Sequence, residues 1–419
     1  MQSEDKIFLT RLYDAAVAAA DPQQRLAAHL PPPPRGRTVV IGAGKGAAQL
    51  AAAFERLWPG ELSGVVVTRY GYGCATSRIP VMEAAHPVPD AAGLLASEAL
   101  LQAVEGLGPE DLVVALICGG GSALLPAPPE GLTLQDEADL NRALLASGAP
   151  ISVMNALRRQ VSRIKGGRLA AAAHPAKVVT LVVSDVPGDD PAQVASGPTV
   201  PDPGTLPEAL ELAADWRIDL PQRIRSWLEG GGAPAPLPTD AVFARNEVQV
   251  IASARLSLEA AARQAEAMGV PAVILSDAIE GEARDVGQVH AAIAREVALR
   301  GRPLPRPVVL LSGGETTVTL KGQGRGGRNT EFLLAFAAAA EGLPLAALAA
   351  DTDGIDGSEA NAGAFADGTT AARLRAEGQP ARGYLSRNDA WGAFDRLGDL
   401  FTPGPTGTNV NDFRAILIR

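Results

Sequence analysis

Short apolar runs alternate with longer segments of helical periodicity through the first half of the chain. The apolar or β-branched runs cover residues 38–41, 65–68, 111–118 and 178–183, and helical patterns cover about 45–57, 133–147 and 151–163. A run that is apolar throughout, such as 111–118, is typical of a strand buried on both faces. Strands that alternate with helices predict a parallel, doubly wound α/β sheet.

The second half of the chain has its own pattern of strands and helices. Its expected strands are 248–252, 272–275, 307–311, 316–320, 345–349 and 414–418, and its expected helices are 254–268, 282–299 and 328–340. The strands at 307–311 and 316–320 are interpreted as a hairpin around Ser312–Glu315, which predicts a mixed sheet. Gly230–Pro238 (GGGAPAPLP) is the best candidate linker. We therefore expect a Rossmann-like N-terminal domain over 1–235 and a second α/β domain over 236–419.

Composition narrows the class of function. The 37 basic and 47 acidic residues give a net charge of −10, which argues against a nucleic-acid surface. The two cysteines cannot build a disulfide framework or a cysteine zinc site. Met1–Leu9 lacks the apolar core of a signal peptide, and Glu341, Gly342 and Pro344 interrupt the apolar stretch 332–350. We expect a cytoplasmic protein with neither a membrane nor a nucleic-acid partner.

Two glycine loops follow expected strands of the first domain. Gly42–Ala47 fits G-x-G-x-x-G/A, a loop that brings backbone N–H groups close to phosphate, and it adds Lys45. No acidic residue ends the next strand, where NAD binding would need one, but Arg69 could accept a 2′-phosphate. The second loop, Gly119–Ser122, can form an anion-binding nest of N–H groups, although Ser122 could also act only as a helix cap.

Carboxylates and cations follow in the same domain. Ser184–Pro191 holds three aspartates in six residues, which suits either Mg²⁺ binding or a general base, or else turns made by aspartate side chains. The basic run 155–168 either forms a solvated helix face or points into a cleft. His86 is the one histidine in a suggestive setting, and a lone histidine is often structural.

The second domain supplies three polar loops. Arg328 begins an expected helix behind a run of glycines, where an arginine opposes the helix dipole, and this position suggests a bidentate contact to phosphate or carboxylate. Residues 351–357 resemble a calcium loop, but their spacing fails the EF-hand pattern, so they are expected to add oxygen atoms to the cleft. Residues 406–412 form a polar loop before the last strand.

Taken together and in order, these loops resemble the glycerate 2-kinase family. The segments that carry the resemblance are GAGKGAA at 42, CGGGSALLPAP at 118, IKGGRLA at 164, SDVPGDDPAQVASGPTVPD at 184, SGGETTV at 312, GGRNTEFLL at 326, DTDGIDG at 351 and TGTNVND at 406. They span nearly the whole chain. The MOFRL string that gives the family's C-terminal domain its name is not legible, and residues 331–334 stand in its place.

The resemblance implies an enzyme that phosphorylates D-glycerate at the 2-hydroxyl with ATP, giving 2-phosphoglycerate, with Mg²⁺ or another divalent cation. It implies an active site in the interdomain cleft that contains Lys45 and Arg328, and it leaves open a monomer or a homodimer. The predicted site comprises Lys45, Arg328 and Asp189 in catalysis, Gly44, Gly119, Gly120, Gly121, Ser122, Lys165, Arg168, Ser196, Gly314, Glu315 and Asn329 in substrate or phosphate binding, and Asp185, Asp190 and Asp353 in metal binding.

Two other functions remain open at this point. An NAD(P)H-dependent hydroxypyruvate reductase would use Gly42–Ala47 and Arg69, but it leaves the acidic loops without a role. A sugar-acid or nucleotide sensor without catalysis could use the same fold.

Overall fold

The computed structural model describes residues 1–232 and 234–419, which fold into two compact units. Pro22–Ile251 forms one, here called the parallel-sheet unit. Met1–Asp21 and Ala252–Arg419 together form the other, the mixed-sheet unit. Each contains one six-stranded sheet.

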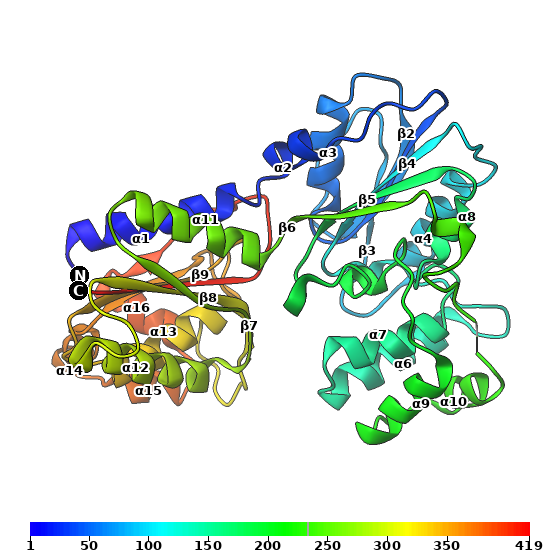
Figure 1. The fold of residues 1–419 in the computed structure, drawn as a ribbon. Helices are drawn as coiled ribbons and strands as arrows, with labels where there is room; N and C mark the ends of the chain where they lie inside the picture. Colours follow the sequence, from blue (N-terminus) through cyan, green and yellow to red (C-terminus); the bar gives the residue numbers. More distant parts are fainter. Residues whose placement is uncertain (233) are drawn as a thin grey trace. The chain divides into compact units, whose positions relative to one another are not determined.

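The parallel-sheet unit has the strand order β3-β2-β1-β4-β5-β6 (Figure 1). The pairs β1–β2, β1–β4, β2–β3 and β4–β5 are parallel. The strands are β1 (Thr38–Ala43), β2 (Ser63–Arg69), β3 (Val81–Ala84), β4 (Leu112–Cys118), β5 (Lys177–Val183) and β6 (Glu247–Ala252). Every residue of β1 and β4 is buried, as the continuous apolar runs predicted.

The helices of this unit are α2 (Pro22–His29), α3 (Ala47–Leu57), α4 (Ala91–Ala103), α5 (Gly121–Leu124), α6 (Leu134–Ser147), α7 (Ile151–Gln160), α8 (Arg168–Ala172), α9 (Leu206–Asp215) and α10 (Gln222–Glu229), with short 3₁₀ turns at Pro187–Asp189, Val194–Ser196 and Ala241–Phe243. Several of them begin directly after strands of the sheet, as α3 does after β1 and α5 after β4. The helix α6 starts at a capping box, in which the Thr133 hydroxyl and the Asp136 carboxylate satisfy each other's backbone N–H groups. Helices α6, α7, α9 and α10 share a small apolar core of their own.

The mixed-sheet unit has the strand order β11-β10-β9-β12-β8-β7. Its strands are β7 (Ala272–Glu282), β8 (Val308–Thr317), β9 (Leu345–Asp351), β10 (Gly363–Asp367), β11 (Leu400–Phe401) and β12 (Asp412–Ile418). Only β7 and β8 pair in parallel, and the other neighbours are antiparallel. The helices are α1 (Ser3–Ala18), α11 (Ala254–Ala267), α12 (Ala283–Arg300), α13 (Arg328–Ala339), α14 (Thr370–Ala376), α15 (Ala381–Leu385) and α16 (Ala390–Leu397).

The fold class is confirmed, since one sheet is parallel and the other is mixed, but two details differ. The hairpin around Ser312–Glu315 is wrong, because 308–317 is the single strand β8. Its Gly314 has a φ of +127°, and a Cβ there would lie 2.2 Å from the Ile279 carbonyl oxygen. The glycine therefore allows β7 to approach closely instead of making a turn.

The units also divide at residues other than the expected 235 and 236. Strand β6 lies beside β5 in the parallel sheet, so residues after the candidate linker remain with the first unit. Helix α1 packs beside α11 in the mixed-sheet unit (Figure 1), with Leu9 and Leu12 in the same apolar core as Ala261. In the described part of the chain, no helix combines the length and apolar character that a membrane span requires.

Candidate active site

The carboxyl ends of β1, β2, β4 and β5 bring the predicted loops of the parallel-sheet unit together. The register aligns Ala43 with both Val67 and Ile117, and Cys118 with Val183. The backbone N–H of Gly44 donates to the Val67 carbonyl (3.1 Å), and that of Lys45 donates to the Gly119 carbonyl (2.9 Å). The two glycine loops therefore form one surface at the edge where open α/β sheets bind ligands.

The absence of side chains allows this close approach. A Cβ on Gly119 would lie 1.8 Å from Oδ2 of Asp185. Gly120 has a φ of +77°, and a Cβ there would lie 3.1 Å from Cε of Lys45 and 3.3 Å from Nε2 of His86. The aliphatic part of Lys45 thus passes directly over the second glycine loop. The ammonium of Lys45 has neither an ion pair nor a hydrogen bond to any residue that the structure describes.

Ser122 and Ser196 lie together, as a common site would require. Their hydroxyl oxygens are 2.8 Å apart, and Ser196 donates to Oδ1 of Asn155 at 2.8 Å. Gly121 also lies in this contact, since a Cβ there would be 2.6 Å from Cβ of Ala195. The second glycine loop is therefore joined to the 3₁₀ turn at 194–196 and to α7.

The acidic loop after β5 does not form a ready metal site. Asp189 has a left-handed φ of 55° at the end of a 3₁₀ turn. Asp190 accepts from the backbone N–H of Ala192 (3.0 Å), and in the other unit Asp353 accepts from that of Ile355 (2.8 Å). Both make aspartate turns, the alternative that the sequence left open for residues 184–191. Across residues 1–232 and 234–419, no three His, Cys, Asp or Glu side chains form a group that could hold a metal ion.

Lys165 and Arg168 contact the chain's own oxygen atoms. Nζ of Lys165 donates to the Leu125 carbonyl (2.7 Å) and to Oε1 of Glu137 (2.6 Å), and only 1% of the side chain is exposed. Arg168 donates from Nη1 to the carbonyls of Arg159 and Lys165. Burial lowers the pKa of Lys165 and lowers that of Arg168 to about 10. Both were predicted to bind substrate, and in this structure both hold loops in place.

In the mixed-sheet unit, Arg328 is the centre of an acidic cluster. Strand register places Asp412 opposite both Gly314 and Asp351, at the edge from which α13 begins. Arg328 donates from Nε to Asp412 (2.6 Å), from Nη1 to Glu315 (2.8 Å) and from Nη2 to Asp351 (2.7 Å). The expected contact to a carboxylate is therefore made with three carboxylates of the protein itself.

Asn329 and Arg414 complete this cluster. Asn329 donates from Nδ2 to Oδ1 of Asp412 (2.8 Å), and its backbone N–H donates to Asp356 (2.9 Å). Burial acts to raise the pKa of Asp412, but the positive charges of Arg328 and Arg414 outweigh it and hold the pKa below its ordinary value. Burial raises the pKa of Asp351 well above its ordinary value despite Arg328. The cluster therefore holds more carboxylates than cations.

Comparison with known proteins identifies the family. Residues 308–412 match the MOFRL family, and residues 8–229 match a domain of unknown function, DUF4147. A glycerate 2-kinase of Pyrococcus horikoshii is 41% identical over 384 residues, which cover 90% of this chain and 86% of that protein. The chain belongs to the glycerate 2-kinase family.

Two further relatives bear on the activity of this family member. A crystal structure of glycerate kinase from Thermotoga maritima superimposes with a TM-score of 0.89 at 36% identity and covers 100% of both chains. A protein of Agrobacterium vitis named putative hydroxypyruvate reductase is 52% identical over 415 residues, 98% of this chain and 94% of that protein. Both names correspond to functions that the sequence raised.

Three residues near Lys45 were weighed in the sequence but not selected, namely Arg69, His86 and Arg158. Burial and the charges of Lys45, Arg69 and Arg158 lower the pKa of His86 to about 4. The histidine is therefore neutral at pH 7 and lies among cations. Sequence spacing could not reveal this group, because its members come from separate loops and from α7.

Proposed function

We propose that this protein is a kinase that transfers the γ-phosphoryl group of ATP to the 2-hydroxyl of D-glycerate. The observation that carries the proposal is the full-length similarity to glycerate kinases, in sequence and in both units of the fold. In the transfer, the 2-hydroxyl oxygen bonds to the γ-phosphorus while the bond from that phosphorus to the β,γ-bridging oxygen breaks. ADP leaves, and the hydroxyl proton passes to a base.

Phosphoryl transfer depends mainly on positioning and on neutralising charge. We assign Lys45 to the transferring phosphoryl group, because its aliphatic stem lies over Gly120 and its ammonium has no partner among the described residues. The backbone N–H groups of Gly119–Ser122 are proposed to hold phosphate. Arg328 is proposed to act in the same reaction, and Asp189 is proposed as the base.

Magnesium enters this proposal as part of the substrate, MgATP. Mg²⁺ in kinases is commonly held by one or two carboxylates together with the nucleotide phosphates. The described side chains do not fit a resident metal site, since no three potential ligands are grouped. Asp185 and Asp190 stay candidates for single contacts to the metal of MgATP, and no step is assigned to it.

The test compares two assays on the same purified protein. D-glycerate with MgATP should give ADP, whereas hydroxypyruvate with NADPH should give no oxidation of the cofactor. Lys45→Ala should lower kcat by about 10²-fold or more, as expected for loss of a charge that stabilises the transition state. Lys177→Ala is the matched control, because that lysine only forms a surface ion pair with Glu247.

The reductase is the second candidate, favoured by the name of the Agrobacterium relative and by Arg69 at the end of β2. Oxidation of NADPH by hydroxypyruvate without any ATP-dependent product would replace the kinase with the reductase.

A further inference from the structure

Arg158 is a buried cation without an ion pair of its own among the described residues, since Glu137, the carboxylate that acts on its charge, is itself paired with Lys165. Only 9% of the residue is exposed. Its Nε and Nη2 donate to Oδ1 of Asn141 (3.1 and 2.6 Å), and its Nη1 donates to Oδ1 of Asn155 (3.1 Å). These partners are neutral amides, and Arg158 has no ion pair among the residues that the structure describes. One carboxylate shared by two buried cations leaves their charge only partly compensated, which is costly, so the group indicates a place where an anion binds.

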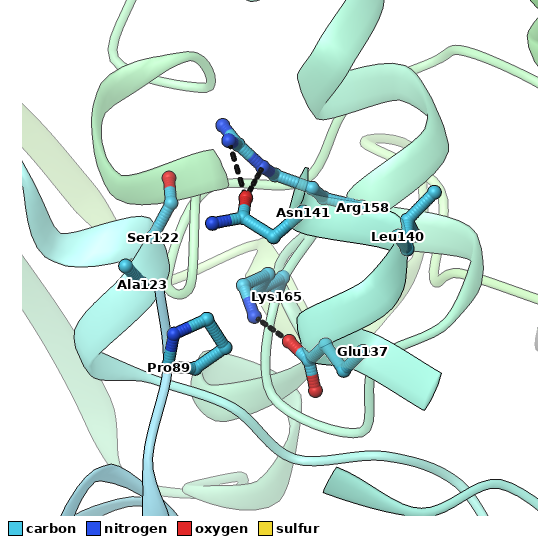
Figure 2. A pocket seen from close by; sticks show the side chains of 8 residues that line it. All are labelled: Pro89, Ser122, Ala123, Glu137, Leu140, Asn141, Arg158 and Lys165. Atoms are coloured by element: carbon cyan, nitrogen blue, oxygen red, sulfur yellow. Dashed lines mark hydrogen bonds and ion pairs between the residues drawn. The ribbon is translucent and has the colours of Figure 1, made fainter. Parts of the chain in front are cut away.

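The guanidinium faces a small cavity in the parallel-sheet unit. The cavity has room for about one water-sized group, about 10 Å³. Its lining residues are Pro89, Ser122, Ala123, Glu137, Leu140, Asn141, Arg158 and Lys165. In the view of Figure 2, the Arg158 guanidinium and the Ser122 hydroxyl lie above, and the Lys165–Glu137 ion pair lies below.

The two cations of this cavity differ in what they can offer a ligand. Lys165 is neutralised by Glu137 and also donates to the Leu125 carbonyl. Arg158 is held in one orientation by two asparagines that do not neutralise it. A ligand carboxylate would therefore gain most from Arg158, while Asn141 and Asn155 act as positioning residues.

Other positive charges lie close to the same place. Lys45 and Arg158 both act on the buried His86, as does Arg69, whose guanidinium stacks on the ring of Tyr72 at 3.7 Å. Neither Lys45 nor Arg69 has an ion pair within the described residues. Three cations without ion pairs of their own in the described part of the chain thus act on one neutral imidazole, which makes this part of the unit attractive to a small anion.

We propose that Arg158 binds the carboxylate of the hydroxy-acid substrate, with one carboxylate oxygen in this cavity beside the hydroxyl of Ser122. A carboxylate oxygen is about as large as the single water that the cavity admits, whereas a nucleoside is far larger. A guanidinium N–H that donates to such an oxygen forms a charge-assisted hydrogen bond. The inference rests on the proposed kinase activity only for the name of the acid, D-glycerate.

The test measures binding separately from turnover. Calorimetry gives the Kd of D-glycerate and of its neutral amide, D-glyceramide, in the presence of a non-hydrolysable ATP analogue. Arg158→Gln should raise the Kd of D-glycerate about 10- to 100-fold, because a hydrogen bond to a charged group is lost. The Kd of D-glyceramide should change less than threefold. Arg163→Gln removes a surface arginine paired with Glu98 and should change neither.

A second variant keeps the side-chain shape. Asn141→Asp puts a carboxylate on Nε and Nη2 of Arg158, so it should neutralise the guanidinium and weaken D-glycerate to a similar extent. This variant replaces Arg158→Gln in the binding test if Arg158→Gln does not fold. In the unaltered protein, D-glycerate should bind at least 10-fold more tightly than D-glyceramide, and equal affinities would overturn the proposal.

The other outcomes of the binding test also decide whether the proposal stands. Equal weakening of acid and amide by Arg158→Gln would show a structural role and overturn the proposal. If Arg158→Gln weakens binding of the ATP analogue and leaves the Kd of D-glycerate unchanged, the site binds phosphate, and the proposal is overturned as well. If D-glycerate binds through Arg158 but is never phosphorylated, the carboxylate site stands and the proposed kinase activity fails.

Discussion

Lys165→Met tests whether the lysine of the segment IKGGRLA at 164 stabilises the fold or binds the substrate. The change removes an ammonium that is buried with Glu137, with side-chain exposures of 1% and 8%. Breaking a buried pair by removing one partner costs about 3–5 kcal/mol, because the other charge stays buried without compensation. The Leu125 carbonyl loses its donor as well, which adds about 1–3 kcal/mol.

These magnitudes are large for a domain whose total stability is about 5–15 kcal/mol. Urea unfolding, followed by circular dichroism, should therefore show a much lower midpoint for Lys165→Met than for the unaltered protein. Glu137 also accepts from the backbone N–H of Ala127 (3.0 Å). The double variant Lys165→Met/Glu137→Gln keeps that contact without a buried charge, so it should recover about 1–2 kcal/mol.

The opposite pattern would refute this reasoning. If Lys165 were mainly a phosphate ligand, Lys165→Met would raise the KM for ATP and leave the free energy of unfolding within about 0.5 kcal/mol of that of the unaltered protein. Lys177→Met is the control for removing a lysine at the surface, where the ion pair with Glu247 contributes about 1 kcal/mol or less.

Gly120→Ala and Gly71→Ala both place a side chain at a φ of +77°, but only the first meets Lys45, and Gly71 has open space around it. Both variants should lose about 1–2 kcal/mol of stability, and only Gly120→Ala should lower kcat, by about 10-fold or more. Equal kcat values for the two variants would show that the contact between Gly120 and Lys45 does not matter for the reaction. Arg328→Lys keeps the charge but loses the planar fork that reaches three carboxylates, so kcat should fall at least about 10-fold, and an unchanged kcat would remove the arginine from the reaction. Burial lowers the pKa of His290 to about 4, so the unfolded state takes up its proton first as the pH falls below 6.5. The free energy of unfolding should drop by about 2 kcal/mol between pH 7 and pH 5 from this group, and His290→Gln should reduce that pH dependence; an identical dependence in both proteins would contradict the assignment.

Much of the fold was visible in local pattern. Residues 112–118 form a strand that is buried throughout, and the glycines that follow lead into a helix. Both features could be predicted, because apolar runs and glycine turns depend on residues that are close together in the sequence. Family motifs then pointed to Lys45, which the structure places over Gly120.

What the sequence could not reveal depends on contacts between distant segments. Strand β6 was assigned to the second domain by the linker before it, yet it completes the first sheet beside β5. Helix α1 joins the other unit, where the Tyr13 hydroxyl donates to the Asp351 carbonyl at 2.9 Å. Lys165 was predicted to bind substrate from its place in the segment IKGGRLA, and the sequence could not show its ion pair with Glu137, which lies in a helix well before it in the chain. Local periodicity contains no information on any of these pairings.

Phosphorylation at the 2-hydroxyl of D-glycerate is decided by the structure of the product. The protein is incubated with D-glycerate and MgATP, and the product is observed by ³¹P NMR without proton decoupling. A phosphate on C2 couples to one proton. We therefore expect a ³¹P doublet whose intensity grows together with that of ADP. A triplet, from phosphate on the two-proton C3, or inorganic phosphate alone would contradict it.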